Sequence, residues 1–302
     1  MAAGVVAVRS SQVVLGLDPD PARLWPRALA LAHDGASESD PAAKAARAVV
    51  AHCRLAIEAT AEVCAGVKLQ VACFERLGAP GWAALRDVTE IARERGLFVI
   101  ADAKRGDIDI SAAAYGQAFF GETETPFGPI PGIGADAMTV NPLLGADSLA
   151  PLVSAARRRG GGLFVLVRTT NPGAADVQEL RLAASQASVS DRLAEIVTEI
   201  GAPGVGPSGL SDVGAVVGAT APHRLDALRE RMPHAIFLLP GVGAQGGNVR
   251  DLKAAFAPGP AGGLIAVSRG IIGAYERTGG EPARAAAEEA GRLREMAWTL
   301  AA

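Results

Sequence analysis

Eight short apolar runs alternate with longer helix-like stretches along almost the whole chain, and this alternation limits the possible folds more than any other feature. The runs cover residues 13–17, 65–69, 97–101, 137–141, 163–169, 213–218, 235–239 and 264–267. Continuous apolar runs of this length are typical of strands that are buried on both faces of a parallel sheet. Eight strand–helix units without a break in composition predict one (β/α)8 barrel domain over residues 1–302. An open doubly wound sheet is the alternative.

Helices are expected between the predicted strands, and one insertion interrupts the pattern. The predicted helices cover residues 41–60, 81–95, 110–120, 147–159 and 177–200, with others shortly after Pro222, from about Asn248 and from about Pro282. The Gly- and Pro-rich segment 121–134 follows the third strand–helix unit. Its composition predicts a loop or a lid rather than a linker between domains.

The third predicted strand ends in the charged sequence DAKRGD, which is the strongest local indication of a functional site. Residues two apart in a strand point to the same side, so Asp102 and Lys104 share a face, and Gly106 allows a turn before Asp107. An ammonium group flanked by two carboxylates stays charged, which suits a fixed cation or a proton donor. A surface salt-bridge cluster is the alternative, but it does not explain why the charges directly continue an apolar strand.

Polar side chains also follow the other predicted strands. In a (β/α)8 barrel, the carboxyl ends of the strands carry the chemistry. The polar residues at or just beyond these ends are Asp18, Lys68, Asp102, Lys104, Asn141, Thr169, Thr170, Asn171, Gln245, Ser268 and Arg269. Their convergence at one end of a barrel predicts an active site there.

The last two strands end in sequences that favour an anion. PGVGAQGG, residues 240–247, contains a GxGxxG pattern, but it comes at the seventh strand, and residues 252–275 contain no acid to bind a ribose. Glycines allow backbone N–H groups to approach an anion, and the next strand ends in Ser268, Arg269 and Gly270. We therefore predict a phosphate site, with two tight turns and a surface arginine as the alternative.

Composition excludes several classes of function. The net charge is −3, aromatic residues are only 4% and there is no basic block, so nucleic acid is not an expected partner. No apolar run is long enough to cross a membrane, and the N-terminus lacks a signal-peptide pattern. Three cysteines without CxxC spacing predict reduced thiols, and these features together predict a cytoplasmic protein. The four histidines have no metal-ligand spacing, so no metal site is expected.

Several of these motifs together resemble the orotidine 5′-phosphate decarboxylase family, in its longer bacterial branch. DAKRGDI, residues 102–108, is similar to the D-x-K-x-x-D-I motif of that family. The other similar segments are LGLDP (15–19), VKLQVACFE (67–75), NPLLGADS (141–148), RTTNPGA (168–174), PGVGAQGG (240–247) and SRG (268–270). The segments follow one another in the order of the family. Leu69 and Leu143 depart from its pattern, where proline and an aromatic residue are expected.

The resemblance implies a (β/α)8 barrel that decarboxylates orotidine 5′-monophosphate to uridine 5′-monophosphate and CO2 without a cofactor. It implies Lys104 as the cation and proton donor to C6 of the pyrimidine, with Asp102 beside the substrate carboxylate. Lys68 is implied in the charged network and at the ribose, and Asp18 at the ribose.

The resemblance further implies a homodimer in which Asp107 and Ile108 reach into the neighbouring subunit's site. Asn141 is also expected to contact the substrate. The other implied contacts are Thr169 or Thr170 at the pyrimidine edge, Gln245 between base and phosphate, and Arg269 with Gly246, Gly247 and Gly270 at the phosphate.

Three other functions remain open from the sequence. A Mg²⁺-dependent sugar-phosphate decarboxylase or aldolase of the same barrel group would use an extra carboxylate where the second strand offers Lys68. A Schiff-base aldolase would use Lys104 or Lys68 as nucleophile, although the acids next to Lys104 disfavour that role. A catalytically silent nucleotide-binding protein is expected to have lost a charged residue, yet Lys68, Asp102, Lys104 and Asp107 are all present.

Overall fold

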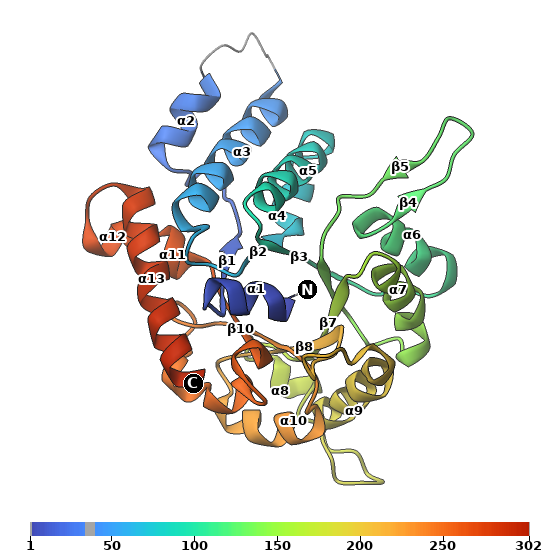
Figure 1. The fold of residues 1–302 in the computed structure, drawn as a ribbon. Coiled ribbons are helices and arrows are strands. Elements are labelled where there is room, and N and C mark those ends of the chain that lie inside the picture. Colours follow the sequence, from blue (N-terminus) through green and yellow to red (C-terminus); the bar gives the residue numbers. More distant parts are fainter. Residues whose placement is uncertain (1, 34–39, 302) are drawn as a thin grey trace.

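The computed structural model describes residues 2–33 and 40–301, and its main feature is a closed barrel of eight parallel strands (Figure 1). Around the barrel these are β1 (Val13–Leu17), β10 (Gly263–Val267), β9 (Phe237–Pro240), β8 (Val213–Val217), β7 (Gly162–Arg168), β6 (Ala137–Val140), β3 (Phe98–Arg105) and β2 (Gly66–Gln70). The (β/α)8 prediction is therefore confirmed, and the open doubly wound sheet is wrong. Each strand begins within two residues of its predicted start.

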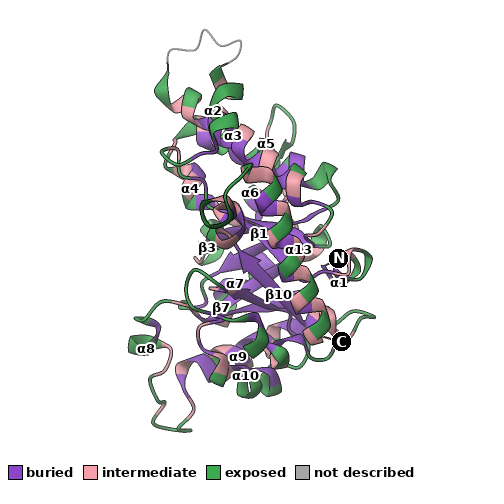
Figure 2. Ribbon diagram, turned by 90° about the vertical axis from the view of Figure 1, so that its left-hand side faces the viewer, coloured by how far each residue is buried: buried purple, intermediate pink, exposed green. Residues whose placement is uncertain are grey.

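Helices surround the barrel and bury one face each against it. Those of the regular strand–helix units are α3 (Pro41–Thr60), α5 (Ala79–Glu94), α6 (Asp109–Phe119), α7 (Ala146–Arg158), α9 (Val189–Gly201), α10 (Leu225–Arg231) and α13 (Pro282–Ala301). Figure 2 shows buried strands at the centre and exposed outer faces on the helices. Additional helices are α2 (Pro26–His33), α4 (Val71–Glu75), α8 (Ala174–Val177), α11 (Arg269–Ile272) and α12 (Ala274–Thr278). Over the described ranges, no helix has the length and apolarity needed to span a membrane.

One further helix, α1 (Ala2–Arg9), was not predicted from the sequence. It lies across the amino-terminal end of the barrel, which faces the viewer in Figure 1. Ala2 and Val6 pack with Val14 and Phe98 in the apolar cluster inside this end. The amino-terminal end of the barrel is thus covered by the chain itself, and the carboxyl end is left for a site.

The insertion after the third unit is a β-hairpin rather than a loop. It contains β4 (Glu122–Thr123) and β5 (Ile130–Pro131), which pair antiparallel. It joins the end of α6 to the start of β6, so it leaves the barrel at the amino-terminal end of the strands, and Figure 1 shows it extending past the helices. It lines a cavity with Arg93 and Arg159, near the last turns of α5 and α7. Because this end lies opposite the carboxyl ends of the strands, the lid prediction is wrong.

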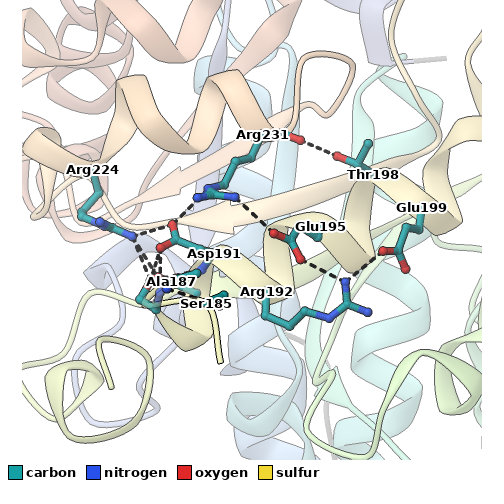
Figure 3. Close-up of polar contacts among 11 residues, drawn as sticks. Ser185, Ala187, Asp191, Arg192, Glu195, Thr198, Glu199, Arg224 and Arg231 are labelled. Carbon is teal, nitrogen blue, oxygen red and sulfur yellow. Dashed lines mark hydrogen bonds and ion pairs between the residues drawn. The ribbon is translucent and has the colours of Figure 1, made fainter. Parts of the chain in front are cut away.

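The helix predicted over residues 177–200 is wrong in its first half, because α8 ends at Val177 and α9 begins only at Val189. Ser188 begins α9 with a capping box, in which its hydroxyl accepts from the Asp191 backbone and Asp191 accepts from the Ser188 backbone. Asp191 also binds Arg224 at 2.8 Å and Arg231 at 3.4 Å, the latter from α10 (Figure 3). This cap and its two cationic partners fix the start of α9 at a point that apolar periodicity does not reveal.

The helix predicted from Asn248 is also wrong, because the chain there forms short 3₁₀ turns. These are η3 (Val249–Asp251), η4 (Lys253–Phe256) and η5 (Pro260–Gly262). Prolines at positions 258 and 260 lack the N–H that a continuing helix needs. The glycine-rich loop after β9 therefore does not lead into a helix, as the sequence pattern had suggested.

Candidate active site

Asp102 and Lys104 lie at the carboxyl end of β3, where the strand departs from regular pairing. Pairing with β6 shifts between Ala101 and Arg105, so that β3 advances four residues while β6 advances two. Such a bulge re-aims side chains at the end of a strand. Lys104 adopts a left-handed backbone conformation with a φ of 49°. That conformation costs a residue with a Cβ roughly 1 kcal/mol and often marks a functional position.

The carboxylate of Asp102 lies between two ammonium groups. Lys68 Nζ, from β2, donates to Oδ2 at 2.6 Å, and Lys104 Nζ donates to Oδ1 at 2.6 Å. The sequence predicted the reverse, a lysine between two carboxylates. The structure differs because Asp107 turns away and accepts a hydrogen bond from the backbone N–H of Ile108 at 2.8 Å.

These close charges fix the ionisation of the network. Burial alone would raise the pKa of Asp102, but the charges and hydrogen bonds of Lys68 and Lys104 outweigh it and hold that pKa well below its usual range. Burial alone would lower the pKa of Lys68, but Asp102 and Asp18, the latter 3.9 Å away, raise it above its usual range. The Lys68 side chain is 10% exposed and that of Lys104 45% exposed. Lys104 is therefore the ammonium group that a substrate can reach.

A cavity of about 220 Å³ collects most of the predicted site residues at the carboxyl end of the barrel. Those that line it are Asp18, Lys68, Asp102, Lys104, Thr169, Thr170, Gln245, Arg269 and Gly270. Apolar residues also line it, from β7, β8, β9 and β10: Leu166, Val216, Leu238 and Ala266. A cavity with charged groups and an apolar surface suits a flat ring that carries polar substituents.

The loop after β9 forms a compact turn that depends on glycine. Gly241, Gly243 and Gly246 have φ values of 99°, 75° and 91°, which only glycine adopts at little cost. Gly246 N donates to Gly243 O at 2.8 Å, and Gly247 N donates to Gly241 O at 3.0 Å. The N–H groups of Gly246 and Gly247 are thus engaged inside the loop, contrary to the expectation that they would contact a phosphate.

Arg269 is the cation at this side of the cavity. It follows β10, is exposed, and has no carboxylate partner within the described ranges. Gln245 and Gly270 line the cavity near it in sequence. An unpaired, permanently charged guanidinium in a cavity wall favours an anionic ligand.

Thr169 and Thr170 both line the cavity, but their hydroxyl groups differ. Thr169 Oγ1 donates to Asn171 Oδ1 at 2.7 Å and accepts from Gln178 Nε2 at 2.9 Å. The Thr170 hydroxyl has no partner among the residues that the structure describes, and its methyl group lies against Gly218 and Gly241. Thr170 is therefore the residue with a hydroxyl available to a ligand.

Other predicted site residues lie outside this cavity. They are Asp107, Ile108, Asn141, Gly246 and Gly247. Asn141 Oδ1 accepts from the Leu143 backbone N–H at 3.0 Å, so its side chain holds the turn after β6. Within the described part of the chain, no three His, Cys, Asp or Glu side chains are grouped to hold a metal ion.

Two cavity residues were missed from the sequence, Gln70 and Thr139. Gln70 Nε2 donates to Asp102 Oδ2 at 3.3 Å, and Thr139 Oγ1 donates to Asp102 Oδ1 at 2.8 Å. Thr139 lies inside the predicted strand 137–141 and not at its end, and Gln70 lies just beyond the predicted strand 65–69. The period of two from Lys68 to Gln70 and from Thr139 to Asn141 was the available signal.

Comparisons with known proteins agree on one family. The model of the "Orotidine 5'-phosphate decarboxylase / HUMPS family" matches residues 11–280. An orotidine 5′-phosphate decarboxylase of Rhodopirellula baltica is 42% identical over 88% of this chain and 85% of its own. One of Deinococcus radiodurans is 45% identical over 71% of this chain and 74% of its own. The solved structure of Leishmania donovani OMP decarboxylase has a TM-score of 0.71 and 32% identity, covering 99% of each chain.

Proposed function

This chain belongs to the orotidine 5′-phosphate decarboxylase family, and from that membership we propose how its cavity works. The enzyme converts orotidine 5′-monophosphate to uridine 5′-monophosphate and CO2, a step of pyrimidine nucleotide biosynthesis. The observation that carries the mechanism is the Lys68–Asp102–Lys104 network, open to the cavity at Lys104 and faced by the unpaired Arg269.

In the proposed mechanism, Lys104 supplies the charge and the proton. When the bond from C6 to the carboxylate breaks, its electron pair stays on C6 in the plane of the ring, where the π system does not absorb it. The Lys104 ammonium stabilises this developing carbanion and then transfers a proton to C6. No cofactor takes part, because the electrons leave C6 only into the new C–H bond.

Asp102 and Lys68 set the charges around the reacting carbon. Asp102 lies beside the substrate carboxylate and repels its charge, a repulsion that ends when CO2 forms. Lys68 offsets the buried charge of Asp102 and, with Asp18, contacts the ribose. The lowered pKa of Asp102 and the raised pKa of Lys68 keep both groups ionised near neutral pH.

The rest of the substrate binds across the cavity. Arg269 and Gly270 hold the phosphate, and Gln245 lies between phosphate and base. Thr170 meets the pyrimidine edge, because its hydroxyl is free while that of Thr169 is bound. Binding energy from the phosphate holds the pyrimidine ring at Lys104, so it also lowers the barrier of the reaction at C6.

The alternative functions are not favoured. The relatives at 42% and 45% identity are orotidine 5′-phosphate decarboxylases and not sugar-phosphate enzymes. Lys68 stands between Asp18 and Asp102, where a metal-dependent enzyme would need a carboxylate. Lys104 Nζ is held by Asp102 Oδ1 at 2.6 Å, so it is not free to attack a carbonyl as a Schiff base requires.

Loss of orotidine monophosphate absorbance is the direct test of this function. We expect the purified protein to convert it to uridine monophosphate at an undiminished rate in EDTA. Activity that disappears in EDTA and returns with Mg²⁺ would contradict the cofactor-free mechanism. No conversion by a well-folded protein would contradict the function itself.

A second copy of the chain is proposed to cover the open end of the barrel. Ile108 and Ile110 are 52% and 85% exposed after β3, and Leu143 and Leu144 are 78% and 52% exposed after β6. β3 and β6 are neighbours in the barrel, so we infer that these residues lie on one apolar surface beside the cavity. In a symmetric dimer built on this surface, Asp107 and Ile108 reach the partner's site.

The three free cysteines support a cytoplasmic location.

Mixing two inactive variants tests the shared site. If Lys104 and the partner's Asp107 serve one site, mixed dimers of Lys104→Ala and Asp107→Ala contain one intact site. Random exchange makes half of the dimers mixed, so we expect about a quarter of the wild-type activity to return. Lys104→Ala mixed with Asp102→Asn is the control, since both residues come from the same subunit and no site is restored. Equal activity in the two mixtures would contradict the shared site.

A further inference from the structure

Thr139 lies in β6 opposite the bulge of β3 and is 1% exposed. Its neighbours Met138 and Val140 belong to the core between barrel and helices. Because side chains alternate along a strand, Thr139 points to the inside of the barrel, where it lines the cavity. It carries no charge and follows no motif, and the mechanism above does not use it.

The Thr139 hydroxyl connects the two reactive residues of β3. The backbone N–H of Lys104 donates to Thr139 Oγ1 at 2.9 Å, and Oγ1 donates to Asp102 Oδ1 at 2.8 Å. A backbone N–H only donates, so the single hydroxyl hydrogen is left for the carboxylate. The direction of both hydrogen bonds is therefore set by their chemistry.

The Thr139 hydroxyl also provides a hydrogen-bond partner for a backbone group that the bulge leaves without one. The bulge removes the partly buried Lys104 N–H from the regular ladder between β3 and β6, where a backbone N–H without a partner is costly. Thr139 satisfies it and so supports the left-handed conformation of Lys104. Threonine is also stiff about χ1, so the position of its hydroxyl is well defined.

Both ends of the Lys104 side chain are then anchored through Thr139. Its backbone is held directly, and its ammonium group is held by Asp102 Oδ1, the same oxygen that accepts from Thr139. We propose that Thr139 is a positioning residue for the decarboxylation, which keeps the Lys104 ammonium group aligned with C6. This inference rests on the proposed function of the cavity. A small displacement of a reacting group slows the chemical step far more than it weakens substrate binding.

Isosteric replacement tests the inference. Thr139→Val keeps the shape and removes both hydrogen bonds, and we expect kcat to fall about 100-fold while KM stays within about threefold. Thr139→Ser keeps both hydrogen bonds, and we expect its kcat to remain within about fivefold of the wild-type value. Thr139→Cys, with a weakly bonding thiol, should lie between them and serves if the valine variant does not fold.

Thr89→Val is the matched control for burial. Thr89 in α5 is also 1% exposed, and its hydroxyl donates to Leu85 O at 2.9 Å, far from the cavity. It should lose thermal stability as Thr139→Val does and keep its kcat. A valine variant with wild-type kcat, a loss confined to KM, or serine and cysteine variants of equal kcat would overturn the positioning role.

The proposed function is checked in the same assay. If wild-type protein fails to convert orotidine monophosphate, or Lys104→Ala keeps wild-type activity, the proposed function fails and the inference fails with it. If wild type and Lys104→Ala behave as expected while the Thr139 variants do not, only the positioning role is overturned.

Discussion

Replacement of Lys104 by alanine is expected to lower kcat by about 10⁴-fold or more, because it removes both the cation at C6 and the proton donor. Each of these contributions is typically worth two to four powers of ten when it is lost alone. The Lys104 side chain is 45% exposed, and Asp102 keeps Lys68 at 2.6 Å, so the fold should survive. Steady-state rates and thermal unfolding of the same preparation measure the two effects separately.

Two variants show which property of Lys104 matters. Lys104→Arg keeps the charge, but a guanidinium holds its proton too tightly to give it to carbon, so kcat should remain far below the wild-type value. Lys253→Ala removes an exposed lysine from η4, outside the cavity, and should leave kcat unchanged. An arginine variant with wild-type turnover would show that charge alone suffices and would contradict proton transfer from Lys104.

The barrel was predictable because its signal is repeated. Eight buried strands each need a continuous apolar run, and β1 and the helix α3 are found at their predicted bounds. α3 is also marked locally, since the Asp40 side chain accepts from the N–H groups of Ala42 and Ala43, and Pro41 follows it. Pattern and cap agree there, which is why the boundary could be read from the sequence.

The errors lie where contacts between distant parts of the sequence, or the topology of the barrel, decide the structure. α9 begins at Val189, after the N-cap Ser188, and Asp191 of its capping box is bound by Arg224, a residue 33 positions away. No periodicity in a single stretch contains that contact. The lid prediction for residues 121–134 failed for another reason, because composition indicates a loop and only the barrel topology shows at which end it lies.

Some features of the site were predictable from the sequence and others were not. Asp102 and Lys104 were recognisable because charges that continue an apolar strand are unusual. Their true arrangement depends on the bulge and on the Lys104 backbone, which neither motif nor propensity specifies. Thr139 and Gln70 were missed because neutral donors in strands are common, and their role appears only when the Asp102 carboxylate lies beside them.

Replacement of Asp102 by asparagine is expected to damage both activity and stability. Removing the carboxylate leaves the buried Lys68 ammonium without its 2.6 Å partner, and breaking one side of a buried ion pair typically costs about 3–5 kcal/mol. The pKa of Asp102 is lower in the folded state than in the unfolded state. Ionised Asp102 therefore stabilises the fold fully at pH values above its unfolded-state pKa of about 3.8, and this stabilisation is lost as the pH falls from there toward the folded-state pKa. Denaturant unfolding at pH 7 should therefore show the full difference, and at pH 3 a smaller one.

A double variant separates the two effects of this substitution. Lys68→Met combined with Asp102→Asn removes both buried charges, so most of the lost unfolding free energy should return. Decarboxylation should not return, because the Lys104 ammonium then lacks the carboxylate that orients it and that repels the substrate carboxylate. If Asp102→Asn were as stable as wild type, groups other than Asp102 would stabilise the buried Lys68 ammonium, and the predicted loss of stability would be wrong. If the double variant regained turnover with its stability, Asp102 would act through the fold and not in the reaction.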